Sequence, residues 1–135
     1  MASFVKINSF VENLAEKLID LSGAALTVAL TNTAHEDAWD ELADLTEVAY
    51  TNCSSRVITV TTSAQTAGTY KLVCADLTLT ASGAVGPFRY VYIYDDDSTG
   101  DKLIAYYDYG SSVTLANGDT FKVDFNQDDG VLTIA

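Results

Sequence analysis

The sequence contains few of the residue types that carry out chemistry. It has one histidine (His35), one proline, one tryptophan and two cysteines. A zinc site takes three or four nitrogen or sulfur ligands at characteristic spacing, which one histidine and two distant cysteines do not supply. The chain also lacks GxSxG, Walker, GxGxxG and HExxH motifs, and the only base available to its many Ser and Thr side chains is His35. We therefore predict that the protein is not an enzyme and holds no cofactor, and we interpret His35 as a solvated loop residue.

Basic residues are scarce as well. The chain has 7 Lys and Arg against 19 Asp and Glu, a formal net charge of -12. Nucleic-acid binders carry clustered basic residues because phosphate contacts dominate their affinity, whereas here the basic residues are scattered singly. No apolar run approaches the roughly 20 residues of a membrane span, and no basic start followed by an uninterrupted apolar stretch marks a signal peptide. We expect no nucleic-acid partner and no membrane association.

The two cysteines, Cys53 and Cys74, do not form a CxxC motif. Without an export signal, we expect a reducing compartment and free thiols. Cys74 lies in an apolar run and is interpreted as a small core residue. A disulfide between the two cysteines is the less favoured alternative.

Two acidic turns raise the question of calcium. One contains Asp95, Asp97 and Asp101, and the other contains Asp124 and Asp128. Calcium takes six to eight oxygen ligands, so clustered carboxylates are a precondition for a site. Neither cluster matches the EF-hand loop, and Asp is an ordinary turn former because it hydrogen-bonds its own backbone. We expect turns here, with calcium as the alternative.

The N-terminal third predicts one helix, one strand and one loop. Ser9 and Glu12 fit a capping box, and apolar residues at helical spacing follow, so we predict a helix over about 9–21. Residues 26–31 alternate and predict a strand. The segment from about 33 to 55 has six acids and no Lys or Arg before residue 53. We expect it to be a long loop with one or two helical turns, held down by Trp39.

The remainder, 56–135, predicts only strands. Glycine-rich and Asp/Asn-rich turns separate short runs with β character. The predicted strands are 57–62, 69–74, 77–80, 88–94, 103–109, 120–125 and 131–134. Because 135 residues suffice for one compact domain and are few for two, we predict a single mainly β domain over 1–135. Its expected architecture is an antiparallel β-sandwich, jelly-roll or immunoglobulin-like, with one N-terminal α-helix.

Two of these strands are crowded with tyrosine and are apolar on both faces. Period-2 alternation places Phe88, Tyr90, Tyr92 and Tyr94 on one face of their strand. One face must fill the core, and the other must be covered by the N-terminal helix or by another chain. Tyrosine suits a subunit boundary because it buries area while keeping a polar tip. The interface candidates are Phe4, Trp39, Tyr90, Tyr92, Tyr94 and Tyr106.

Several framework motifs carry a resemblance to a known family. They are LTVALTNT at 26–33, SAQTAGTYKLV at 63–73, GPFRY at 86–90, DYGSS at 108–112, GDTFKVDF at 118–125 and GVLTI at 130–134. Together they resemble a family of small proteins that tailed bacteriophages and prophages encode among their virion structural genes. The resemblance spans most of the chain and is weakest over 34–52.

The resemblance implies a virion component without catalytic residues. The function it favours is that of a capsid decoration (cement) protein, bound as an oligomer, expected to be a homotrimer, to the outer surface of the major capsid protein lattice. The strong negative charge fits such a protein, which must stay soluble before it binds. A tail, fibre-base or head-fibre component is one alternative. A carbohydrate-binding or host-binding β-sandwich module, with aromatic residues stacked on sugar rings, is the other.

Overall fold

The computed structural model describes residues 2–22 and 25–135, and it is mainly β. It has one short α-helix, α1 (Phe10–Ala15), and one turn of 3-10 helix, η1 (Leu42–Asp44). The strands are β1 (Val5–Lys6), β2 (Leu26–Thr31), β3 (Val60–Thr66), β4 (Thr69–Cys74), β5 (Leu77–Thr80), β6 (Val85–Asp95), β7 (Leu103–Leu115), β8 (Thr120–Val123) and β9 (Leu132–Ile134). All the strand pairs are antiparallel, which confirms the predicted fold class.

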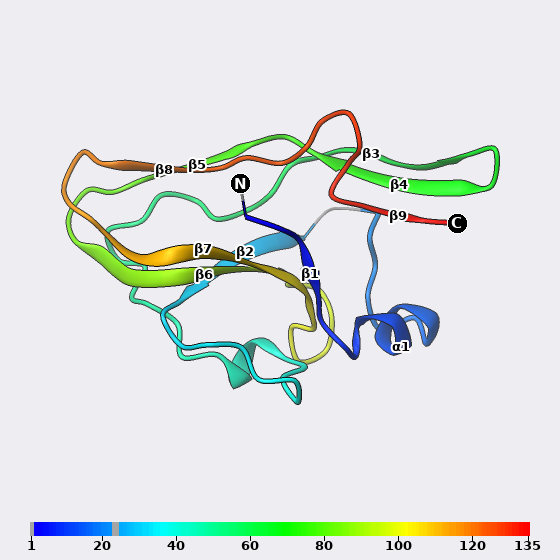
Figure 1. Ribbon diagram of the computed structural model, residues 1–135, viewed down its shortest axis with the longest axis horizontal. Coiled ribbons are helices and arrows are strands. Elements are labelled where there is room, and N and C mark those ends of the chain that lie inside the picture. Colours follow the sequence, from blue (N-terminus) through cyan, green and yellow to red (C-terminus); the bar gives the residue numbers. More distant parts are fainter. Residues whose placement is uncertain (1, 23–24) are drawn as a thin grey trace.

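The strands form two layers (Figure 1). One is a four-stranded sheet in the order β1-β7-β6-β2, and the other contains the sheets β3-β4-β9 and β5-β8. The layers face each other as in a β-sandwich, and Phe88 of β6 packs edge-on against Phe121 of β8 with ring centroids 5.0 Å apart. Leu79 and Val91, one from each layer, belong to the same buried cluster. The core therefore lies between the layers.

A register shift decides which β6 side chains enter the core. The pairing of β6 with β7 is irregular between Phe88 and Tyr90. Phe88 and Val91, three positions apart, consequently both face β8: Phe88 contacts Phe121 there, and Val91 lines a cavity with it. Uninterrupted alternation predicted that Phe88 shares a face with Tyr90 and Tyr92. In the structure Phe88 lies on the opposite face, so this prediction was wrong. Between these two pairs β6 advances two residues, from Phe88 to Tyr90, while β7 advances five, from Val113 to Asp108, and this irregularity interrupts the period of two.

Helix α1 is shorter than the predicted 9–21, and the capping box is absent. Ser9 makes no side-chain cap bond; its hydroxyl donates instead to Asp40 at 2.6 Å. The helix ends where Lys17 adopts a left-handed conformation with φ 67°. The N–H of Leu18 then bonds the carbonyl of Asn13 at 2.8 Å, a Schellman ending that sequence reasoning missed because glycine is its usual signal. No helix in the described part of the chain is long and apolar enough to cross a membrane.

The segment after β2 forms an irregular edge to the main sheet. The N–H of Val48 donates to Leu30 at 3.0 Å and the N–H of Ile58 donates to Leu26 at 2.8 Å. Val57 also bridges to Thr27 of β2, which is why β3 begins at Val60 and not at the predicted residue 57. The outer edge of β2 is therefore covered by residues 46–58 of the same chain.

Candidate binding surfaces

The chain itself covers much of the tyrosine-rich face of the main sheet. Tyr92 is 0% exposed and Tyr94 is 3% exposed. The Tyr92 hydroxyl lies 2.9 Å from Nδ1 of His35, and the ring of Tyr106 stacks on His35 with centroids 4.5 Å apart. The cover comes from His35 and Trp39 of residues 33–55, which we call the acidic segment, and not from α1. Tyr92 and Tyr94 are thus removed as interface candidates, since neither presents a surface to a partner.

His35 is not the solvated residue that its polar neighbours suggested. It is half-buried, with Trp39 packed edge-on at a centroid distance of 5.6 Å. Burial lowers the pKa of His35, and the charges of Asp37 and Glu36 oppose that shift. A histidine in a polar loop gives no local signal of its contacts when its partners come from strands far along the chain.

The other four interface candidates remain partly exposed to solvent. Trp39, Tyr90, Tyr106 and Phe4 are each half-buried. Trp39 and Tyr106 both pack against His35, and we call these three residues the His35 cluster. Phe4 lies elsewhere and packs edge-on against Tyr107, with ring centroids 6.0 Å apart. The structure therefore divides the predicted interface between two separate places, and their role in binding stays a prediction.

The acidic segment is anchored by a lysine from the turn between β6 and β7. The ammonium of Lys102 lies 2.6 Å from Asp40 and 2.8 Å from Glu41. Its pKa is raised by hydrogen bonds to these two carboxylates and by their charges. Sequence reasoning missed this contact because it joins residues about sixty positions apart.

In the first acidic turn, the carboxylate of Asp95 binds the backbone. Asp95 is 2% exposed and accepts hydrogen bonds from the N–H groups of Asp20 at 2.9 Å and Asp97 at 3.1 Å. Burial and the neighbouring carboxylates raise the pKa of Asp101. Within residues 2–22 and 25–135, no three His, Cys, Asp or Glu side chains are grouped as metal ligands. Calcium binding at Asp95, Asp97 and Asp101, or at Asp124 and Asp128, stays the less favoured alternative to simple turns.

Both cysteines are free thiols. Cys74 is buried in β4, as its apolar surroundings indicated, and burial raises its pKa to about 11. Cys53 is half-buried, and its pKa is also raised by burial. Neither thiol has the lowered pKa of a reactive cysteine.

The two ends of the chain form an apolar groove of about 420 Å³ between β1, α1 and β9. We call it the terminal groove; it is lined by Phe4, Lys6, Phe10, Val11, Leu14, Ala15, Leu132, Thr133 and Ile134. Val11 is 54% exposed and Ile134 is 41% exposed. In the described part of the chain, the outer edges of β1 and β9 pair with no other strand. Sequence reasoning found only Phe4 here, because β1 has two residues and leaves no periodic signal.

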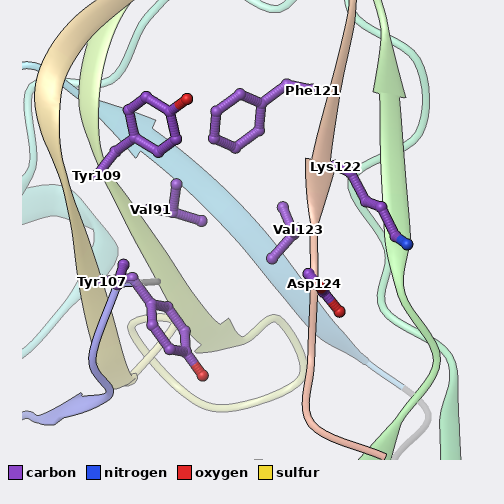
Figure 2. A pocket seen from close by; sticks show the side chains of 8 residues that line it. Val91, Tyr107, Tyr109, Phe121, Lys122, Val123 and Asp124 are labelled. Carbon is purple, nitrogen blue, oxygen red and sulfur yellow. The ribbon is translucent and has the colours of Figure 1, made fainter.

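A second cavity, of about 280 Å³, lies between the two layers. We call it the interlayer cavity. Figure 2 shows Val91, Tyr107 and Tyr109 on one side and Phe121 and Val123 on the other. Tyr109 and Phe121 close one end with ring centroids 5.2 Å apart. Ala2, Lys122 and Asp124 complete the lining.

Comparison of the chain with protein-family models, with curated proteins and with solved structures finds no match.

Proposed function

We propose that this chain is a virion structural protein of a tailed bacteriophage, namely a capsid decoration (cement) protein. It binds the outer surface of the major capsid protein lattice as a homo-oligomer, expected to be a trimer. The proposal joins the resemblance of the framework motifs to one structural observation. That observation is the terminal groove, an apolar surface built from both ends of the chain.

The terminal groove has the properties of a subunit contact. Soluble monomers rarely expose large contiguous apolar patches, and such patches mark interaction sites. Val11 and Ile134 expose apolar surface there, and β1 and β9 offer backbone donors and acceptors at sheet edges. We assign the groove to contacts between copies of the chain.

Charge favours the same surface. A molecule with a net charge of -12 repels its own copies. The lining of the terminal groove includes one charged side chain, Lys6, and no carboxylate. The lining of the groove therefore adds no carboxylate of its own to the repulsion between two subunits. In a trimer the groove of one subunit contacts a different surface of the next, a heterologous contact that forms a ring when the rotation between subunits closes. A ring on a symmetric shell gains avidity from many modest contacts.

The test compares two substitutions with the same chemistry at sites of equal exposure. Val11→Glu places a carboxylate in the terminal groove, and Val57→Glu places one beside β2, where Val57 is 53% exposed. We expect light scattering to give an oligomer for the unchanged chain and for Val57→Glu, and a folded monomer for Val11→Glu. A monomeric unchanged chain, or an oligomer that survives Val11→Glu, would refute the assignment of the groove.

Copy number separates a decoration protein from other virion components. Quantitative gel densitometry of purified particles should give hundreds of copies of the chain per particle. Tens of copies or fewer would indicate the tail, fibre-base or head-fibre alternative. Absence from particles would exclude a virion role altogether.

The His35 cluster favours the carbohydrate-binding alternative. Trp39 and Tyr106 are half-buried aromatic rings in contact with His35 at the surface of the main sheet. Aromatic faces of this kind stack on sugar rings. Specific binding on a glycan array that is lost in Trp39→Ala would support this function in place of capsid decoration.

A further inference from the structure

The interlayer cavity carries a second inference, which is independent of the terminal groove because no residue lines both. We propose that the interlayer cavity binds a small neutral aromatic molecule that carries one hydrogen-bonding group, of the size of a phenol or an indole.

Volume sets the size of the ligand. A cavity of about 150 Å³ accommodates benzene, and sites for drug-sized ligands begin at about 300 Å³. The interlayer cavity, at about 280 Å³, lies between these values. It therefore suits one ring with a substituent or two fused rings.

The walls set the chemical class. Three aromatic rings, those of Tyr107, Tyr109 and Phe121, surround the cavity together with the methyl groups of Val91 and Val123 (Figure 2). Aromatic rings favour offset-stacked or edge-on neighbours at centroid distances of about 4.5–7 Å. A flat aromatic ligand can make such contacts with rings from both layers at once, whereas a branched aliphatic ligand of equal volume cannot.

The hydroxyl of Tyr107 supplies the polar contact. Its ring is half-buried in the lining, and no group in the described part of the chain donates a hydrogen bond to its oxygen or accepts its proton. Burial raises the pKa of Tyr107 to about 12, so the hydroxyl stays protonated at neutral pH and can donate. A ligand that accepts this hydrogen bond satisfies a group that is otherwise partly desolvated.

The rim disfavours an anionic ligand. The ammonium of Lys122 lies 3.0 Å from a carboxylate oxygen of Asp76, so its charge is already paired. Figure 2 shows the Lys122 side chain extending away from the cavity. Asp124, two residues further on, lies at the rim close to the Lys122–Asp76 pair. Among the described residues that line the cavity, the rim therefore offers an anion no unpaired positive charge, which leaves neutral aromatic molecules as the favoured class.

The test uses phenol as the probe and methyl-resolved NMR as the readout. We expect saturable shifts of the Val91 and Val123 methyl signals as phenol is added at millimolar concentration, with no shift at Val11 or Ile134 in the terminal groove. Benzene should bind more weakly than phenol. Benzoate, which has the same ring and a negative charge, should not shift these signals.

Two variants locate the binding. Tyr107→Phe keeps the ring and removes the hydroxyl, so the affinity for phenol should fall about fivefold and that for benzene should not. Ala2→Trp should close the cavity beside the chain end and abolish both shifts, and the unchanged signals of buried Val28 would show that the fold is intact. Absence of saturation in the unchanged chain, or shifts that persist in Ala2→Trp, would overturn the proposal whatever the outcome for the terminal groove.

Discussion

At the scale of single residues, Asp40 is the junction of three parts of the molecule. One of its oxygens accepts hydrogen bonds from the Ser9 hydroxyl and the Asn13 amide, both at 2.6 Å, and the other lies 2.6 Å from the Lys102 ammonium. The carboxylate therefore ties the start of α1 and the turn between β6 and β7 to the acidic segment. Burial raises the pKa of Asp40, but the hydrogen bonds and the Lys102 charge outweigh it, so the pKa lies below its usual value.

We predict that Asp40→Asn lowers the free energy of unfolding by about 1–3 kcal/mol at neutral pH, because a charge-assisted network loses its acceptor. A pKa that is lower in the folded state stabilises the protein above the unfolded-state pKa, and this stabilisation is lost as pH falls through the folded-state value. The difference between Asp40→Asn and the unchanged chain should therefore shrink as pH falls below 3.8.

Urea denaturation over a series of pH values measures this effect. Asp128→Asn is the control, since Asp128 is exposed and its carboxylate makes no hydrogen bond or ion pair within the described residues. A difference that is independent of pH, or equal in the two variants, would show that Asp40 has no special electrostatic role.

At the scale of elements, the two outer edges of the main sheet differ in how their backbone groups find hydrogen-bond partners. Residues 46–58 cover the outer edge of β2, and the guanidinium of Arg56 donates to the carbonyl of Val28 at 2.6 Å. The hydroxyl of Tyr50 accepts the buried N–H of Leu30 at 2.9 Å and donates to Glu47 at 2.7 Å. Side chains thus satisfy this edge where a regular strand is missing, which leaves β1 as the edge of the main sheet that is open to pairing among the described residues.

Tyr50→Phe tests whether the Tyr50 hydroxyl takes the place of a neighbouring strand at this edge. The change leaves the Leu30 N–H without its acceptor while keeping the ring under Arg56, whose guanidinium carbon lies 3.7 Å from the ring centroid. We expect a loss of about 1–3 kcal/mol in the free energy of unfolding by urea. Tyr109→Phe, at a residue that is 53% exposed, should change the free energy by less than about 0.5 kcal/mol. Equal effects in the two variants would mean that the covered edge needs no acceptor.

At the scale of the whole molecule, charge and apolar surface oppose each other. The net charge of -12 repels copies of the chain from one another, whereas the contact that we propose at the terminal groove draws them together. The balance depends on ionic strength, because salt screens repulsion between exposed charges and leaves apolar contacts intact.

We therefore predict that self-association strengthens as sodium chloride is raised from low to physiological concentration. Sedimentation velocity at fixed protein concentration measures the shift from monomer to oligomer. Weakening of the oligomer by salt would show instead that ion pairs, and not the terminal groove, hold the subunits together.

Where local signals suffice, the sequence predicted the structure closely. Strands β2, β4 and β5 have the predicted bounds. The turn before β4 shows why: Ala67 and Gly68 have φ values of 51° and 86°, a conformation that glycine favours and that ends one strand and begins the next. Strand β1 and the early end of α1 were missed, because a two-residue strand and a left-handed lysine have no periodic or compositional signal.

By itself, the sequence determined the β character, the turns and the excess of negative charge, since each follows from the preferences of neighbouring residues. The tertiary structure alone decided which tyrosines are buried, where the terminal groove lies and which sheet edges stay open. His35 and Tyr92 meet although they are 57 positions apart. No local pattern encodes such a contact, because it depends on how the whole chain packs its two layers and the segment that covers them.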